Sequence, residues 1–145
     1  MSEALVTLAI GMIAGAVRVG TPYLFVSLGE CITEKSGRVN LGLEGILVSG
    51  AMCGYAVSYL TQSAWIGVGC AAGVGLMLGL LHGLVCSLPR VNDIAFGIAL
   101  MLLGTGLAFF LGKPYIQPQA PQLPSLALGA WSGDPRWRSA LAVNA

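Results

Sequence analysis

The feature that most constrains this 145-residue chain is the absence of charged residues over long stretches. No Asp, Glu, Lys or Arg occurs between Glu44 and Arg90, and none occurs between Asp93 and Lys113. About 20 apolar residues in a helix cross a hydrocarbon core of ~30 Å. Only 9% of all residues are charged, whereas soluble domains carry roughly 25%. The sequence therefore predicts an all-α, polytopic integral membrane protein and excludes a soluble enzyme.

Four apolar stretches are long enough to be transmembrane helices. We expect the spans at residues 4–28, 42–60, 65–88 and 94–111. Within the first stretch, Pro22 follows a glycine and a threonine. Because proline removes a helical hydrogen bond, two short helices are an alternative to one span there. The chain meets no cation before Arg18, so we expect a retained span rather than a cleaved signal peptide, which needs a positive start.

Glycine spacing predicts how these helices pack. Many of the 21 glycines are four residues apart, which places each pair on one helix face. Small residues allow membrane helices to approach closely, where packing replaces the missing hydrophobic drive. Three glycines share a face of the third span, namely Gly75, Gly79 and Gly83. We expect this face to be a tight helix contact.

The connections between spans predict the orientation in the membrane. Residues 34–40 hold two cations and residues 89–93 hold one, whereas residues 61–64 hold none. Lys and Arg favour cytoplasmic loops. We therefore expect 34–40 and 89–93 in the cytoplasm and 61–64 outside.

The chain changes character after the fourth span. Residues 112–138 hold five prolines with interleaved glutamines, and proline at that density opposes helix formation. We expect a Pro-rich extracytoplasmic loop there. Residues 139–145 turn apolar again, which is typical of the beginning of a truncated fifth span.

Charged and glycine residues are concentrated between the first two spans. The residues that we select as a gate or structural motif are Glu30, Asn40, Gly42, Glu44 and Gly45. Asn40 is a plausible N-cap for the following helix. Glu44 would then lie near the positive end of the helix dipole. It would pair with Lys35 or Arg38, or cap a helix end.

Two other polar positions are weaker candidates. Asn92 and Asp93 begin the fourth span, where they would either line a translocation path or form a plain interfacial turn. His82 is the single histidine, with Cys86 four residues later, and it is expected to be a packed residue bonded to a carbonyl. We expect no catalytic group, no metal site and no cofactor. The net charge of +1 provides no basic surface for nucleic acid.

The segment from Gly29 to Gly45 resembles a known signature. Its Gly-Glu pair, followed by Ser-Gly-Arg-Val-Asn-Leu-Gly-Leu-Glu-Gly at 36–45, is similar to the permeases of bacterial ABC importers for ribose, nucleosides and branched-chain amino acids. Thr21-Pro22, Asn92 with Gly97, and Gly112-Lys113-Pro114 resemble further blocks of that family. The similarity covers about residues 14–130, and it is strongest to the simple-sugar and nucleoside permeases. Asp93 and Met101 depart from the pattern, since many members carry Gln and Asn there.

The resemblance implies a function and a set of partners. It implies a permease subunit in the bacterial plasma membrane, lining a path for a small polar solute such as a nucleoside or simple sugar. A second permease subunit, a cytoplasmic ABC ATPase and an extracytoplasmic substrate-binding lipoprotein would complete the importer. It also implies that the chain is an N-terminal part of a longer permease.

Other classes of function have weaker sequence support. The alternative is an ATP-independent channel or proton-linked carrier, which would need ionisable groups facing one another in the membrane. A membrane enzyme would need a nucleophile with a base, or a cluster of metal ligands, and neither pattern is visible in the sequence.

Overall fold

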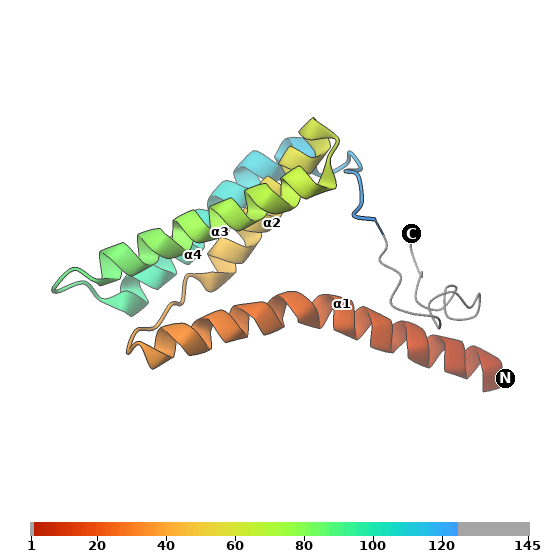
Figure 1. Cartoon of the computed structure of the whole chain (residues 1–145), viewed down its shortest axis with the longest axis horizontal. Helices are drawn as coiled ribbons and strands as arrows, with labels where there is room; N and C mark the ends of the chain where they lie inside the picture. Colours follow the sequence, from red (N-terminus) through yellow and green to blue (C-terminus); the bar gives the residue numbers. More distant parts are fainter. Residues whose placement is uncertain (1, 125–145) are drawn as a thin grey trace. The chain divides into compact units, whose positions relative to one another are not determined.

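The computed structural model describes residues 2–124, and these residues form helices connected by short turns (Figure 1). The long helices are α1 (Ser2–Lys35), α2 (Leu43–Thr61), α3 (Ala64–Cys86) and α4 (Asp93–Gly112). A short 3-10 helix, η1 (Lys113–Tyr115), follows α4 directly. The described part contains no strand, which confirms the predicted all-α class.

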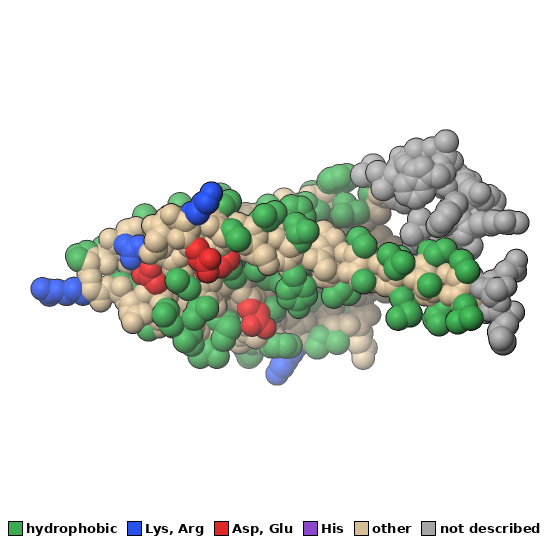
Figure 2. Space-filling view, turned by 90° about the horizontal axis from the view of Figure 1, so that it is seen from below, with side chains coloured by type: hydrophobic (Ala, Val, Ile, Leu, Met, Phe, Trp, Pro, Cys, Tyr) green, Lys and Arg blue, Asp and Glu red, His purple; other side chains and the backbone are tan. Residues whose placement is uncertain are grey.

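All four long helices have the length and composition to cross a membrane. Their apolar side chains are mostly exposed, among them Leu76 at 73% and Phe109 at 72%. Figure 2 accordingly shows few charged side chains among many hydrophobic ones on the face that it draws. A surface of this kind is stable in lipid and not in water, because exposed apolar patches of such extent mark membrane or protein contacts.

Helix α1 continues through the Gly-Thr-Pro sequence as one helix of 34 residues. Pro22 lies inside it, and the Thr21 hydroxyl donates to the Val17 carbonyl at 2.7 Å. Of the two alternatives for this stretch, the structure therefore has the single helix. Serine and threonine side chains of this kind help to accommodate proline in membrane helices.

The chain divides into two units, each described by itself. One unit is Leu28–Leu123, and the other joins Met1–Ser27 with Pro124–Ala145. In the first unit, α2 packs on both α3 and α4, and α2 and α4 point in the same direction with α3 antiparallel to them (Figure 1). The connection from α1 to α2 and the connection from α3 to α4 lie at the same end of this unit.

The C-terminal predictions fall only partly on described residues. The predicted loop begins at residue 112, whereas in the structure Gly112 ends α4, Lys113–Tyr115 form η1, and residues 116–124 form no regular structure. The remainder of the predicted loop, 125–138, and the predicted beginning of a fifth span, 139–145, lie outside the described residues.

Candidate functional site

The connection between α1 and α2, residues 36–42, packs directly against the first turns of α4. A Cβ added to Gly97 would lie 2.8 Å from the backbone nitrogen of Leu41, and one added to Gly42 would lie 3.2 Å from the Gly97 carbonyl oxygen. The atoms nearest to the Gly97 position all belong to the backbone, so no side-chain movement relieves that overlap, whereas the Gly42 position also meets the side chains of Asn40 and Leu100, each at 3.0 Å. The two glycines thus allow the connection and α4 to approach closely, and a larger residue at Gly97 would push the two backbones apart.

Asn40 stabilises this connection, although it is not the helix cap that the sequence predicts. The N-cap of α2 is Gly42, which has no side-chain cap bond. Asn40 is 7% exposed, and its Oδ1 accepts the Gly42 backbone N–H at 2.9 Å. The prediction is wrong because α2 begins at Leu43. The Asn40 side chain instead closes an Asx turn, in which an Asn side chain accepts the backbone N–H two residues further on.

Glu30 ties the end of α1 to the same connection. The backbone N–H of Asn40 donates to Glu30 Oε1 at 3.0 Å, and Glu30 Oε2 is buried without a hydrogen-bond partner among the described residues. The carboxyl group therefore fixes the position of Asn40 relative to α1. A hydrogen bond to a charged group contributes about 1.5–3 kcal/mol, more than one between neutral groups.

An ion pair joins the connection to the beginning of α4. Arg38 Nη1 lies 2.9 Å from Asp93 Oδ1, with 44% of the arginine side chain and 16% of the aspartate side chain exposed. The predicted pairing of Glu44 with Lys35 or Arg38 is not seen in the part of the chain that the structure describes. Glu44 lies exposed in the first turn of α2, where the helix dipole favours an anion.

Asn92 caps α4. Its Oδ1 accepts the backbone N–H groups of Ile94 at 3.0 Å and Ala95 at 3.1 Å. The bonds formed by Asn92 and Asp93 are thus those of a structured interfacial turn, and a role for these two residues on a translocation path stays a prediction.

Helices α2 and α4 are in close backbone contact. A Cβ on Gly45 would lie 2.6 Å from Met101 Cα, and one on Gly104 would lie 2.7 Å from the Gly45 carbonyl oxygen. The Ser49 hydroxyl donates across the contact to the Gly104 carbonyl at 3.1 Å. Of these residues only Gly45 is a predicted candidate, although the small residues at 42, 45 and 49 are a signal in the sequence for this contact.

Helices α2 and α3 approach through a second set of small residues. A Cβ on Gly67 would lie 2.6 Å from the Gly54 carbonyl oxygen and 2.7 Å from Ser58 Cβ. The predicted stripe of Gly75, Gly79 and Gly83 has nothing within 4 Å of its Cβ positions among the described residues. The structure therefore uses the beginning of α3 for this contact, and the packing role of the stripe stays a prediction.

His82 is a buried residue of α3 that faces Phe96 of α4. It is 3% exposed, its ring centroid lies 5.7 Å from that of Phe96, and its Nε2 lies 3.6 Å from Cys86 Sγ. A packed histidine was expected, but in the described structure its neighbour is a thiol and not the predicted carbonyl. No group of three or more metal-ligating side chains occurs among residues 2–124.

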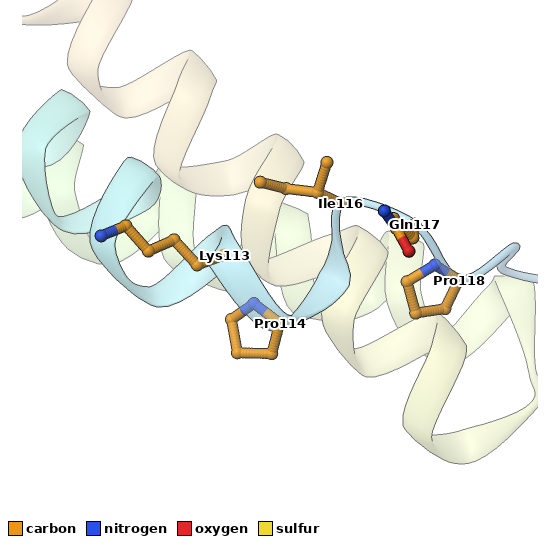
Figure 3. A pocket seen from close by; sticks show the side chains of 5 residues that line it. All are labelled: Lys113, Pro114, Ile116, Gln117 and Pro118. Atoms are coloured by element: carbon orange, nitrogen blue, oxygen red, sulfur yellow. The ribbon is translucent and has the colours of Figure 1, made fainter.

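The opposite end of the unit is closed by the segment after α4. The Tyr55 hydroxyl donates to the Pro118 carbonyl and accepts the Ala120 N–H, and the Tyr59 ring meets the Tyr115 ring edge-on at 6.1 Å. An open hollow of about 570 Å³ lies beside this segment and is lined by Lys113, Pro114, Ile116, Gln117 and Pro118. Figure 3 shows Lys113 and Pro114 on one side of it and Gln117 and Pro118 on the other.

A family model described as a branched-chain amino acid transport system permease component matches residues 12–137, which include the whole connection and all of α2–α4. The chain belongs to this permease family. The match confirms the resemblance inferred from residues 29–45, and it identifies the chain as a transport component. No solved structure matches the chain.

Curated relatives of the permease have related names. A putative glucose ABC transporter permease protein of Haloferax volcanii is 35% identical over 81% of the chain and 36% of its own length. A nucleoside ABC transporter permease protein of Lactococcus lactis is 29% identical over 73% of the chain and 35% of its own length. A guanosine ABC transporter permease protein of Bacillus subtilis is 26% identical over 71% and 34%. The chain thus matches about a third of the length of each relative.

Proposed function

We propose that the chain forms part of the wall of a translocation path for a small polar solute, such as a simple sugar or a nucleoside, as a permease subunit of an ABC importer. The observation that carries the proposal is the family match over residues 12–137. The names of the three relatives, which refer to glucose, nucleosides and guanosine, supply the solute classes.

The partners belong to the same proposal. The sequence has no Gly-Lys-Ser/Thr phosphate-binding motif, which P-loop ATPases use to hold the nucleotide phosphates. We assign ATP hydrolysis to separate cytoplasmic subunits and solute delivery to an extracytoplasmic binding lipoprotein. A second permease subunit would complete the path.

The connection between α1 and α2 is our candidate for the inner gate. It contains Arg38 and Asn40, it is flanked by Glu30 of α1 and Glu44 of α2, and it is held on α4 by backbone contact at Gly97. The packing of α2 on α3 and α4 through glycine and serine supplies a rigid wall behind it. Glu44 is exposed and lies in the first turn of α2, so its charge is available to the path or to a partner.

Uptake of labelled sugars and nucleosides tests the proposal in cells that carry the chain with its complete operon. We expect uptake to require the chain and an active ATPase subunit, and Glu44→Gln to reduce uptake several-fold while membrane insertion is unchanged. The matched control is Arg90→Gln, which removes a charge at the same end of the molecule outside the connection. Uptake that continues without the ATPase subunit would instead support a channel or proton-linked carrier. Normal uptake by Glu44→Gln would remove this residue from the gate.

A further inference from the structure

The Arg38–Asp93 ion pair connects two parts of the chain that are 55 residues apart in sequence. Arg38 follows α1, and Asp93 is the first residue of α4. Among the described residues this is the one ion pair, although six other charged side chains lie in the stretch from Glu30 to Lys113, both ends included. It therefore provides a specific charge contact between the candidate gate and α4.

The backbone around Arg38 differs on its two sides. On one side is Gly37, whose φ of +81° is a conformation that side chains rarely adopt, so the chain turns sharply there. On the other side are the Glu30–Asn40 hydrogen bond and the Gly42–Gly97 backbone contact. Arg38 thus lies between the turn at Gly37 and the packed residues 40–42. Its long side chain reaches from the α1–α2 connection to Asp93 at the beginning of α4.

The contacts of this end differ in how easily they open. At Gly97, where an added Cβ would lie 2.8 Å from the Leu41 backbone nitrogen, the connection and α4 are in direct backbone contact. In the ion pair the arginine side chain is 44% exposed and the aspartate side chain 16%, so water compensates mainly the arginine when the pair breaks. Exposed ion pairs shift an equilibrium by about fivefold at most. The ion pair is therefore the contact that releases at small cost.

We propose that Arg38 and Asp93 form a releasable clasp that holds the α1–α2 connection on the beginning of α4 and opens during each transport cycle. The inference rests on the proposed function of this connection as the inner gate. It assigns Asp93 to positioning the gate, not to contact with the solute. Asn92 keeps α4 capped in both states, because its bonds to Ile94 and Ala95 do not involve Asp93.

A double-mutant cycle tests whether the pair is energetically coupled, independently of transport. Arg38→Gln, Asp93→Asn and the double variant are expressed in membranes, and the fraction that stays monodisperse in detergent after heating is measured. We expect each single change to lower the midpoint temperature, and the second change to lower it no further once the first is present. Arg90→Gln, in the other connection at this end, is expected to leave the midpoint unchanged. Additive losses from Arg38→Gln and Asp93→Asn would overturn the proposal.

A reducible cross-link tests whether the clasp must open. Arg38→Cys and Asp93→Cys are combined in a chain with Cys31→Ser, because Cys31 is exposed. A short bis-methanethiosulfonate linker is used, since an arginine–aspartate pair separates two backbones further than a disulfide allows. We expect the linked protein to lose at least about nine tenths of the uptake that it has before linking and to recover it with a reductant, while the uptake of each single-cysteine variant is the same before and after the treatment.

The outcomes distinguish the clasp from the function on which it rests. Unchanged uptake by the linked protein would overturn release of the clasp. Absence of uptake by the unmodified chain with its operon would instead overturn the proposed function, and release of the clasp with it. The energetic coupling of Arg38 and Asp93 is tested by the double-mutant cycle alone and does not depend on uptake.

Discussion

Gly104→Ala places a methyl group inside the contact between α2 and α4. The new Cβ would lie 2.7 Å from the Gly45 carbonyl oxygen, 2.9 Å from the Gly45 carbonyl carbon and 2.9 Å from Ser49 Oγ. Two of these atoms belong to the backbone of α2, so relief requires α4 to move away by several tenths of an ångström. That movement also stretches the Ser49 bond to the Gly104 carbonyl, which is 3.1 Å long.

The magnitude follows from two opposing effects. Overpacking of a tight contact costs about 1–3 kcal/mol. Alanine is a better helix former than glycine by ~1 kcal/mol, which offsets part of that cost. Gly106→Ala is the matched control, because it lies in the same helix and has nothing within 4 Å of its Cβ position. The helix-propensity gain is common to both variants, so we expect Gly104→Ala to be less stable than Gly106→Ala by about 1–3 kcal/mol.

The assay is thermal unfolding of the detergent-solubilised protein, followed by size-exclusion chromatography of a fluorescent fusion. Gly104→Ala is expected to lower the midpoint temperature, and Gly106→Ala to raise it or leave it unchanged. Equal midpoints for the two variants would refute the close approach of α2 and α4. A lower midpoint temperature for Gly106→Ala alone would mean that α4 contacts its neighbour through the face that carries Gly106 and not through the face that carries Gly104.

Two further predictions concern the ends of α4. Asn92→Ala removes the acceptor of two backbone N–H bonds and should lower the unfolding free energy by about 1 kcal/mol, whereas Asn92→Asp should retain most of it in the same thermal assay. Tyr55→Phe leaves the Pro118 carbonyl and the Ala120 N–H without their common partner, so cleavage of residues 116–123 by an added protease should become faster. An unchanged cleavage rate in right-side-out vesicles would contradict the contact between α2 and this segment.

The helices were predictable because the charge pattern is simple. Charged residues cluster at 30–44 and 90–93, and the helix ends of α2, α3 and α4 differ from the expected spans by at most two residues. Long apolar stretches have few alternatives in lipid, since every backbone group must find a partner within its own helix. Local sequence therefore determines these helices almost completely.

The contacts between helices were not predictable in the same way. Glycines four residues apart occur on each of α1, α2 and α3, so the spacing does not indicate which pair meets a neighbour. The face that is used depends on residues such as Gly104, which meets Gly45 from 59 positions away. The ion pair between Arg38 and Asp93 has the same origin, because three acids lie nearer to Arg38 in sequence than Asp93 does.

The length of α1 has a consequence for the depth of its charged end. Its 34 residues at 1.5 Å each reach about 51 Å, whereas bilayer hydrocarbon is ~30 Å thick and transmembrane helices tilt by about 20° on average. A helix of this length extends beyond the hydrocarbon, and its last turns carry three charged residues suited to the headgroup level, namely Glu30, Glu34 and Lys35.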